Sequence, residues 1–280
     1  MNKTKLDKQL KKFEGYLRVD RGLDVVTVIG YCRGASIALR RMRKFVPQYP
    51  DIKNYIAWMY EKNYSYSHIT NTMLALEHFT AFKGNPVKLS RPKKPKRIIK
   101  DVLSEAEVAR IIQGANDVRK KALVTTLAYS GLRNKELCNL KVSDVDIGKN
   151  QITVIDGKNR TDGICHIAPE CTKVIVDYLR EFPRGNAQYL FTTLKRGHRM
   201  DQADIRKHLK KVAQKAGVER RVYPHQMRHT LATNLLLRGA NPLLIKEQLR
   251  HRHIETTMHY IESNLIRNQT EYEFHKPAYL

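Results

Sequence analysis

A short basic tract divides this chain and limits the folds that it can adopt. Residues 88–100 contain seven lysine or arginine side chains, two prolines and no acidic residue. Such a segment has no apolar face to bury, and its prolines oppose both helix and sheet. The tract therefore predicts an extended connection, over residues 87–101, between two parts that fold separately.

The part before the tract has a helical pattern. Residues 1–86 place apolar side chains at helical spacing in four runs, which predicts a domain of four helices. The first run ends at Arg21-Gly22, the second stops before Pro47, the third covers Asp51–Lys62, and the fourth begins at a Ser67 cap.

The part after the tract, residues 102–280, has a mixed pattern. Ser104 and Glu107 form a capping box that opens one helix. Two β-rich runs, 151–155 and 164–168, flank a predicted hairpin loop. We expect further helices over 120–129, 172–179 and 203–216, and after Pro224 and Asn241. The expected fold class is mainly α, in two domains, with a small β-sheet in the second.

The charge of the chain favours a polyanionic partner. The 280 residues carry 52 Lys+Arg against 27 Asp+Glu, a formal net charge of +25. Such an excess binds phosphate backbones by releasing condensed counterions, which makes nucleic acid the expected partner. The basic tract is then a strap along DNA, although a solvated tether and a localisation signal remain alternatives. Its expected DNA contacts are Lys93, Lys94, Lys96 and Arg97.

The spacing of the cysteines and the hydropathy of the chain indicate in which cellular compartment the protein is expected. The four cysteines show no C-x-x-C pair, which argues against a zinc site and a disulfide framework. No run approaches the roughly 20 apolar residues of a membrane span, and the N-terminus lacks a signal-peptide pattern. We expect a soluble protein of a reducing compartment, in the cytoplasm with the DNA.

Four stretches of the second part hold side chains suited to one chemistry. Arginines can fork onto phosphate oxygens, lysine and histidine can move protons, and a phenol can act as nucleophile when cations surround it. Together these groups are what transfer of a phosphodiester to a tyrosine requires. In chain order the candidates are Arg133, Lys158, His225, Arg228, His251 and Tyr260.

His225, Arg228 and His229 stand at helical positions i, i+3 and i+4, so their side chains can converge on one ligand. A polar surface patch is an alternative, and the two histidines also have the spacing of a helical zinc pair. A zinc peptidase would need an acidic base where Gln226 stands. We expect no metal and no cofactor, and His229 stays open between a structural and a functional role.

Other candidates also have ordinary alternatives. Glu136 lies one turn beyond Arg133 and could orient its guanidinium, but a surface ion pair would show the same spacing. Lys158 is expected at the hairpin tip, where a lysine is usually just solvated, yet a flexible arm could bring its ammonium to a leaving oxygen. Tyr260 would be an ordinary packing or surface residue without His251.

The ordered set resembles the signature of the tyrosine recombinases, the family of phage integrases and Xer-type resolvases. Stretches around Phe13–Leu23, Asn85–Lys94 and Leu103–Val108 resemble that family's opening helix, interdomain linker and catalytic-domain start. Arg250 is a departure, because glycine is common before the family's last histidine. Either that loop is modified or it contacts DNA, and we assign Arg250 to DNA binding together with Arg160 of the hairpin.

The resemblance implies a helical, SAM-like core-binding domain over 1–86 and a catalytic domain over 102–280, which form a clamp around duplex DNA. It implies that Tyr260 attacks a scissile phosphate and leaves a 3′-phosphotyrosyl link and a free 5′-hydroxyl, without ATP or metal. The implied helpers are Arg133 and Arg228 on the phosphate, Lys158 as acid to the leaving oxygen, His225 as acid and base toward the tyrosine, His251 as a phosphate donor and Glu136 as an orienting residue.

The resemblance also implies a tetramer on two DNA sites, with the C-terminal tail docked on a neighbouring subunit. The tail, Glu271–Leu280, carries three aromatic side chains, which fits docking, although packing on its own domain is an alternative. A type IB topoisomerase and a DNA-binding module without catalysis remain competing functions. A host resolvase and a mobile-element integrase are not separated by the sequence.

Overall fold

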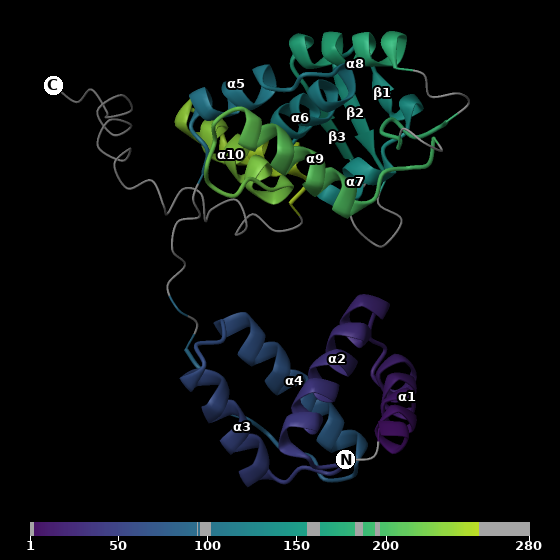
Figure 1. Cartoon of the computed structure of the whole chain (residues 1–280), viewed down its shortest axis with the longest axis vertical. Helices are drawn as coiled ribbons and strands as arrows, with labels where there is room; N and C mark the ends of the chain where they lie inside the picture. The colour runs from purple at the N-terminus through teal and green to yellow at the C-terminus, as the bar shows by residue number, and fades with distance from the viewer. Residues whose placement is uncertain are drawn as a thin grey trace, which may run out of the picture. The chain divides into compact units, whose positions relative to one another are not determined.

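The computed structural model describes two compact units, Met1–Arg97 and Ile98–Leu280 (Figure 1). The described structure is mostly helical, with one three-stranded sheet in the second unit, which confirms the expected fold class. The described residues are 3–93, 95, 102–155, 163–182, 187–193 and 197–251.

The first unit contains the four predicted helices. Apolar side chains recur every three or four residues in each of them, so each helix buries one face. In the third helix the buried face consists of Ile52, Tyr55, Ile56 and Met59. Phe13 contacts Phe79 edge-to-face and Phe82 at a tilt in the neighbouring part of the core. The helices are α1 (Lys3–Val19), α2 (Val25–Met42), α3 (Tyr49–Glu61) and α4 (Tyr66–Phe82).

The predicted cap of α4 was wrong by half a turn. Ser65, not Ser67, is the capping residue, and its side-chain oxygen accepts a hydrogen bond from the backbone N–H of His68 at 3.3 Å. Ser67 lies inside the first turn of the helix. Both serines satisfy the local preference for a cap, and only the backbone conformation at Ser65 (φ −62°, ψ 148°) separates them.

The start of the predicted linker is held against α4 rather than free. The backbone N–H of Leu89 donates to Glu77 of α4 at 2.7 Å, and the Arg91 guanidinium pairs with the same carboxylate. Val87 and Leu89 also pack on the core of the first unit. The linker residues up to Arg91 therefore belong to the first unit.

The second unit surrounds one buried helix. Helix α6 contacts α5, α8, α9, α10 and strand β3, and Figure 1 shows it in the middle of these elements. The helices are α5 (Glu105–Gln113), α6 (Val118–Ser130), α7 (Asn134–Asn139), α8 (Pro169–Glu181), α9 (Gln202–Lys215), α10 (Pro224–Leu237) and α11 (Pro242–Leu249), with a 3-10 turn at Val142–Asp144.

The sheet of the second unit is antiparallel, in the order β1 (Val145–Asp146), β2 (Gln151–Val154), β3 (Gly163–His166). Ile152 pairs with Cys165, and both side chains are buried. The edge of β3 is closed by a side chain: the Gln248 amide accepts from the N–H of His166 at 2.9 Å and donates to its carbonyl at 2.8 Å. The end of α11 is thereby fixed to the sheet.

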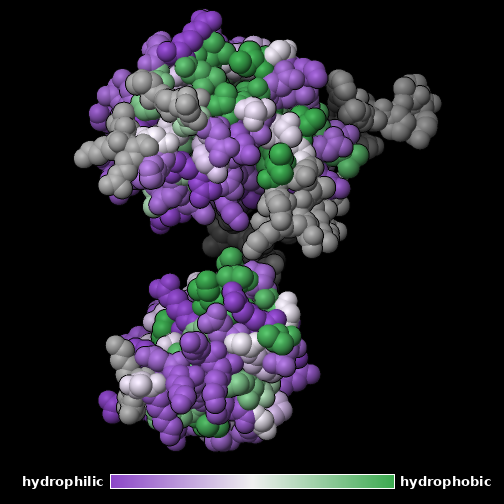
Figure 2. All heavy atoms as spheres, turned by 90° about the vertical axis from the view of Figure 1, so that its right-hand side faces the viewer, coloured by the Kyte–Doolittle hydropathy of each residue, from purple (hydrophilic) through white to green (hydrophobic). Residues whose placement is uncertain are grey.

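The surfaces of both units are predominantly hydrophilic on the face that Figure 2 shows. Among the described residues, no helix is long and apolar enough to cross a membrane. All four cysteines are free thiols, and burial raises the pKa of Cys138 to about 11 and that of Cys171 to about 12.

Candidate active site

The candidate site lies where the ends of α6 and α11 meet the side of α10. Arg228 of α10 is 2 % exposed, and its guanidinium donates to the carbonyl oxygens of Gly131 and Leu249. Carbonyls at helix C-termini lack intrahelical donors, so a buried cation between two such ends satisfies both. Arg228 therefore joins three helices in the centre of the site.

Gly131 lets the chain turn from α6 toward this centre. It adopts the left-handed conformation (φ +63°), and a Cβ atom there would lie 2.5 Å from Leu249 Cδ2. Both the conformation and the close approach require glycine. The turn places Arg133 two residues later, at the start of α7.

Arg133 is bound on two sides. Its backbone N–H donates to Glu136 Oε2 at 2.7 Å, and its Nη1 pairs with Glu136 Oε1. Its Nη2 lies 3.3 Å from the carbonyl oxygen of Arg250. The side chain is still 33 % exposed, so this oriented guanidinium can reach an external anion. The predicted pairing with Glu136 is present, and the buried carboxylate makes it more than a surface ion pair.

The prediction that Arg250 contacts DNA is contradicted by its position. Its side chain is 4 % exposed, with Nη2 2.8 Å from Glu136 Oε2 and Nη1 2.9 Å from the carbonyl oxygen of Gln248. A guanidinium in these contacts is directed into the protein. Burial raises the pKa of Glu136, but Arg250 and Arg133 outweigh it, so the pKa is lowered and the carboxylate stays ionised.

His251 follows directly and is also buried, at 8 % exposure. Its backbone N–H donates to the carbonyl oxygen of Lys246 at 3.0 Å, which closes the end of α11. Burial, with Arg228, Arg133, Arg250 and His225 in decreasing order, lowers the pKa of His251 to about 4. At neutral pH the imidazole is uncharged, so it can donate one hydrogen bond without adding to the positive charge.

His225 and His229 share a face of α10, as their spacing predicted. Their rings are in edge-to-face contact, with centroids 4.3 Å apart and planes at 78°. Among the described residues, no group of three or more histidine, cysteine or acidic side chains is arranged to hold a metal ion.

Several predicted residues lie outside the described part of the chain. They are Lys158 and Arg160 of the hairpin, Tyr260 and the C-terminal tail, and Lys94, Lys96 and Arg97 of the linker. Lys93 is described and is exposed. The structure thus brings together Arg133, Glu136, His225, Arg228 and His251, and leaves the positions of the nucleophile and the lysine as predictions.

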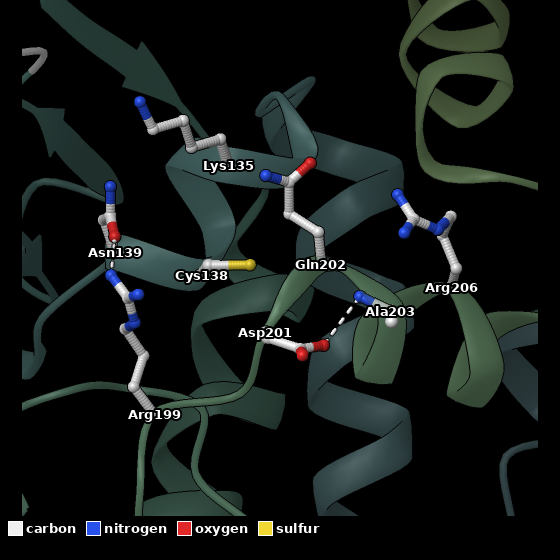
Figure 3. Close-up of a pocket in the computed structure, with 8 residues that line it drawn as sticks. All are labelled: Lys135, Cys138, Asn139, Arg199, Asp201, Gln202, Ala203 and Arg206. Atoms are coloured by element: carbon white, nitrogen blue, oxygen red, sulfur yellow. Dashed lines mark hydrogen bonds between the residues drawn. The ribbon is translucent and has the colours of Figure 1, made fainter. Parts of the chain in front are cut away.

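A basic pocket beside α7 was missed by the sequence analysis. Figure 3 shows Asn139 of α7 next to the Arg199 guanidinium, with Asp201, Gln202 and Arg206 at and near the start of α9 and Lys135 of α7 pointing outward. The pocket has a volume of about 400 Å³. The side chain of Asn134 donates to the carbonyl oxygen of Gln202 at 3.1 Å, which holds α7 and α9 together. These cations lie on elements that are distant in sequence, so no local sequence pattern predicts that they line one pocket.

The fold is that of a class of proteins that cleave and rejoin DNA strands. The sequence profile described as "Phage integrase family" matches residues 101–266. The chain belongs to this family, the tyrosine recombinases, which are enzymes that cleave and rejoin DNA in site-specific recombination.

Individual relatives agree with this assignment. The chain is 32 % identical to tyrosine recombinase XerA of Pyrococcus furiosus over 265 residues, 92 % of this chain and 90 % of the relative. It is 34 % identical to XerA of Pyrococcus horikoshii over 222 residues, 77 % of this chain and 76 % of the relative.

Solved structures agree as well. A crystal structure of XerA recombinase matches 98 % of this chain and all of that chain, at 33 % identity and a TM-score of 0.58. The Tn1549 transposon integrase, in complex with transposon right end DNA, matches 95 % of this chain and 99 % of that chain, with a TM-score of 0.72. At 20 % identity the second likeness concerns the fold.

Proposed function

We propose that this protein recombines specific DNA sites through a covalent 3′-phosphotyrosine intermediate. The Tyr260 phenolic oxygen attacks the scissile phosphorus while His225 takes the phenolic proton. The bond from phosphorus to the 5′ oxygen breaks, and Lys158 gives that oxygen a proton. Arg133 and Arg228 neutralise the charge that develops on the phosphate, and His251 donates to one of its oxygens. Religation runs the same steps backwards, so neither ATP nor metal is required.

One observation carries this proposal: the convergence of Arg133, Arg228, His225 and His251 from three separate segments. Arg228 donates to the carbonyl oxygen of Leu249, two residues before His251, and Arg133 donates to the carbonyl oxygen of Arg250. Arg228, Arg133 and His225 all lower the pKa of His251. A binding module would not need to bury Arg228, Arg250 and an uncharged histidine around one point, since burying charge is unfavourable without compensation. Preorganised donors are what a phosphoryl transition state requires.

The proposed substrate is double-stranded DNA carrying a recombination site. The net charge of +25 supports a polyanionic ligand, and structural relatives include an integrase bound to DNA. The cations Lys135, Arg199 and Arg206 around the pocket beside α7 are suited to backbone phosphates near the site. The basic linker, in which Lys93 is exposed, is proposed to lie as a strap along the DNA backbone.

The two units have separate proposed roles. Residues 1–86 form a DNA-binding domain, 87–101 a linker along the backbone, and 102–280 the catalytic domain, so that the chain closes as a clamp on duplex DNA. The assembly is a tetramer on two sites, in which the tail from Glu271 docks on a neighbouring subunit. Identity to XerA proteins favours an Xer-like resolvase over a mobile-element integrase. Such a protein acts on the nucleoid in the cytoplasm.

The test begins with a DNA site selected by the protein from a random-sequence pool. A nick placed close to the cleavage point lets a short fragment diffuse away, so cleavage traps the protein on DNA. We expect a denaturant-resistant adduct, formed equally in EDTA, and a nucleotide-bearing peptide that contains Tyr260. An adduct on another of the 14 tyrosines would reassign the nucleophile. Cleavage without an adduct, abolished by chelator and restored by Zn²⁺, would replace the proposal with a metallohydrolase.

A further inference from the structure

We propose that Arg250 is a positioning residue for Arg133, acting through Glu136 to hold the Arg133 guanidinium in place and to leave the group of three side chains with a net positive charge toward the phosphate. This inference rests on the proposed function, in which Arg133 binds the scissile phosphate. It gives a role to a side chain that stands where a glycine would be expected.

Three contacts form a closed ring. Arg250 Nη2 lies 2.8 Å from Glu136 Oε2, Glu136 Oε1 pairs with Arg133 Nη1, and Arg133 Nη2 lies 3.3 Å from the carbonyl oxygen of Arg250. The ring fixes Arg133 from both sides, by a carboxylate and by a main-chain carbonyl. A side chain held by a closed ring loses less freedom when a ligand binds, which is the physical basis of preorganisation.

Arg250 occupies a backbone position at which glycine is favoured. Arg250 ends α11 in the left-handed conformation (φ 52°, ψ 50°), where glycine has no steric penalty and other residues do. Its Cγ and Cδ lie against β3, 3.0 Å from where a Cβ would stand on Gly163. The apolar stem of Arg250 is thereby packed against β3 while its guanidinium reaches Glu136.

The charges around Glu136 explain that function. With Arg133 alone, Glu136 would form a nearly neutral pair, and the attraction between Arg133 and a phosphate would be weakened. With Arg250 on its other oxygen, the group of three carries a net charge of +1. Arg133 keeps its exposed guanidinium while Arg250 is almost fully buried, so Arg133 is the member that meets the substrate. Arg250 contributes the second positive charge and holds Glu136 in position, without itself contacting the substrate.

The experiment measures single-turnover cleavage of the nicked site at saturating protein, with the affinity for intact DNA and the melting temperature alongside. Arg250→Met keeps the apolar stem and removes the guanidinium, and Arg250→Lys keeps a charge without the fork. Arg238→Met, which breaks an exposed pair with Glu105, is the matched control. Arg133→Ala is combined with Arg250→Met to ask whether the two side chains act as one unit.

We expect Arg250→Met to slow cleavage by about tenfold to a hundredfold, the cost of a misplaced reacting group, with DNA affinity unchanged. Arg250→Lys should recover part of the rate, and Arg238→Met should equal wild type. In the Arg133→Ala background, Arg250→Met should slow cleavage by no more than about twofold. The effects of two residues that act as one unit on the rate are not additive, because the first substitution already removes the function of both.

Multiplying losses in the double variant would overturn the inference and leave Arg250 as a structural residue. Weakened DNA affinity with normal cleavage at saturation would return it to DNA binding. If Arg250→Met does not fold, the Arg250→Met/Glu136→Gln pair removes both buried charges, and it should cleave as slowly as Glu136→Gln alone. If the wild-type protein forms no adduct with the nicked site, the proposed function itself is rejected. If the wild type cleaves as expected and Arg250→Met cleaves at the same rate, only the positioning role is rejected.

Discussion

The two units of this protein differ in which polar side chains they bury. Among the described residues, the polar side chains buried in the first unit are Thr72 and Thr80, while its arginines and lysines lie at or near the surface. The second unit buries Arg119, Arg228, Arg250 and His251 together with Gln226 and Gln248. Surface charge is sufficient for binding a polyanion, whereas catalysis requires charges that are already oriented and shielded from water.

The buried charges of the second unit also act as structural connections. Arg228 joins α10 to the ends of α6 and α11, and Glu136 joins α7 to the end of α11. The first unit is held by apolar packing and edge-to-face ring contacts instead. Substitutions should therefore affect the two units in different ways, and five measurements can test this difference.

The largest expected effect separates binding from chemistry completely. Tyr260→Phe removes one phenolic oxygen, so it should form no covalent adduct on the nicked site while its affinity for intact DNA stays at the wild-type value. Gel shift in native and denaturing conditions measures both. A denaturant-resistant band from Tyr260→Phe would show that the nucleophile is another residue.

The second effect concerns buried and exposed arginines. Arg133→Ala and Arg228→Ala should each slow cleavage by about 10²-fold or more, the scale of losing one transition-state donor. Arg228→Ala should also destabilise the protein by about 2 kcal/mol or more, because two buried carbonyls lose their partner. The matched change in the first unit, Arg40→Ala, breaks an exposed pair with Asp7 and should change stability by less than about 1 kcal/mol. Equal destabilisation by Arg228→Ala and Arg40→Ala would contradict the comparison.

The third effect is a salt dependence. Replacing Lys93, Lys94, Lys96 and Arg97 by Ser should flatten the plot of log K against log[salt] by about 3–4 units, at roughly 0.9 per phosphate contact. The rate of cleavage at saturating protein should not change, because these surface cations contribute to DNA affinity and not to the chemical step. An unchanged slope would make the linker a solvated tether.

The fourth effect compares two left-handed glycines. Gly22 of the first unit has φ +58° and open space around its Cα, so Gly22→Ala should cost only about 1 kcal/mol of conformational strain. Gly131→Ala should cost about 1–3 kcal/mol more, because the new Cβ overlaps Leu249. Trp58, the single tryptophan, reports unfolding of the first unit by fluorescence, and circular dichroism reports both units. Equal costs would mean that Leu249 moves aside freely.

The smallest effect is on the pH dependence of stability. The pKa of His251 falls from 6.5 to about 4 on folding, so between these values the unfolded chain binds a proton that the folded protein does not. The free energy of unfolding should fall as the pH drops from about 6.5 to about 4, and His251→Gln should flatten this fall. His78→Gln in the first unit should flatten it less, because Glu77 there opposes burial and Arg21. Denaturant melts at several pH values measure both, and identical slopes for wild type and His251→Gln would contradict the assignment.

Much of the fold could be predicted from local rules. Helix faces repeat every three to four residues and caps lie within one turn, so α3 and the α5 capping box were predicted correctly. The misses were also local in origin. Ser65 and Ser67 are equally good caps in sequence, α7 is six residues long, and β1 is a two-residue strand that exists only because β2 pairs with it.

By itself, the sequence determined the kinds and order of the reactive side chains, the excess of positive charge and the face that His225, Arg228 and His229 share. It could not determine which cations face outward. Arg133 and Arg250 look alike in sequence, but one reaches solvent and the other is buried against a carboxylate 114 positions away. Burial and pairing of a charge depend on segments that meet only when the chain folds, so the tertiary structure alone decided which of the two arginines is exposed and which is buried.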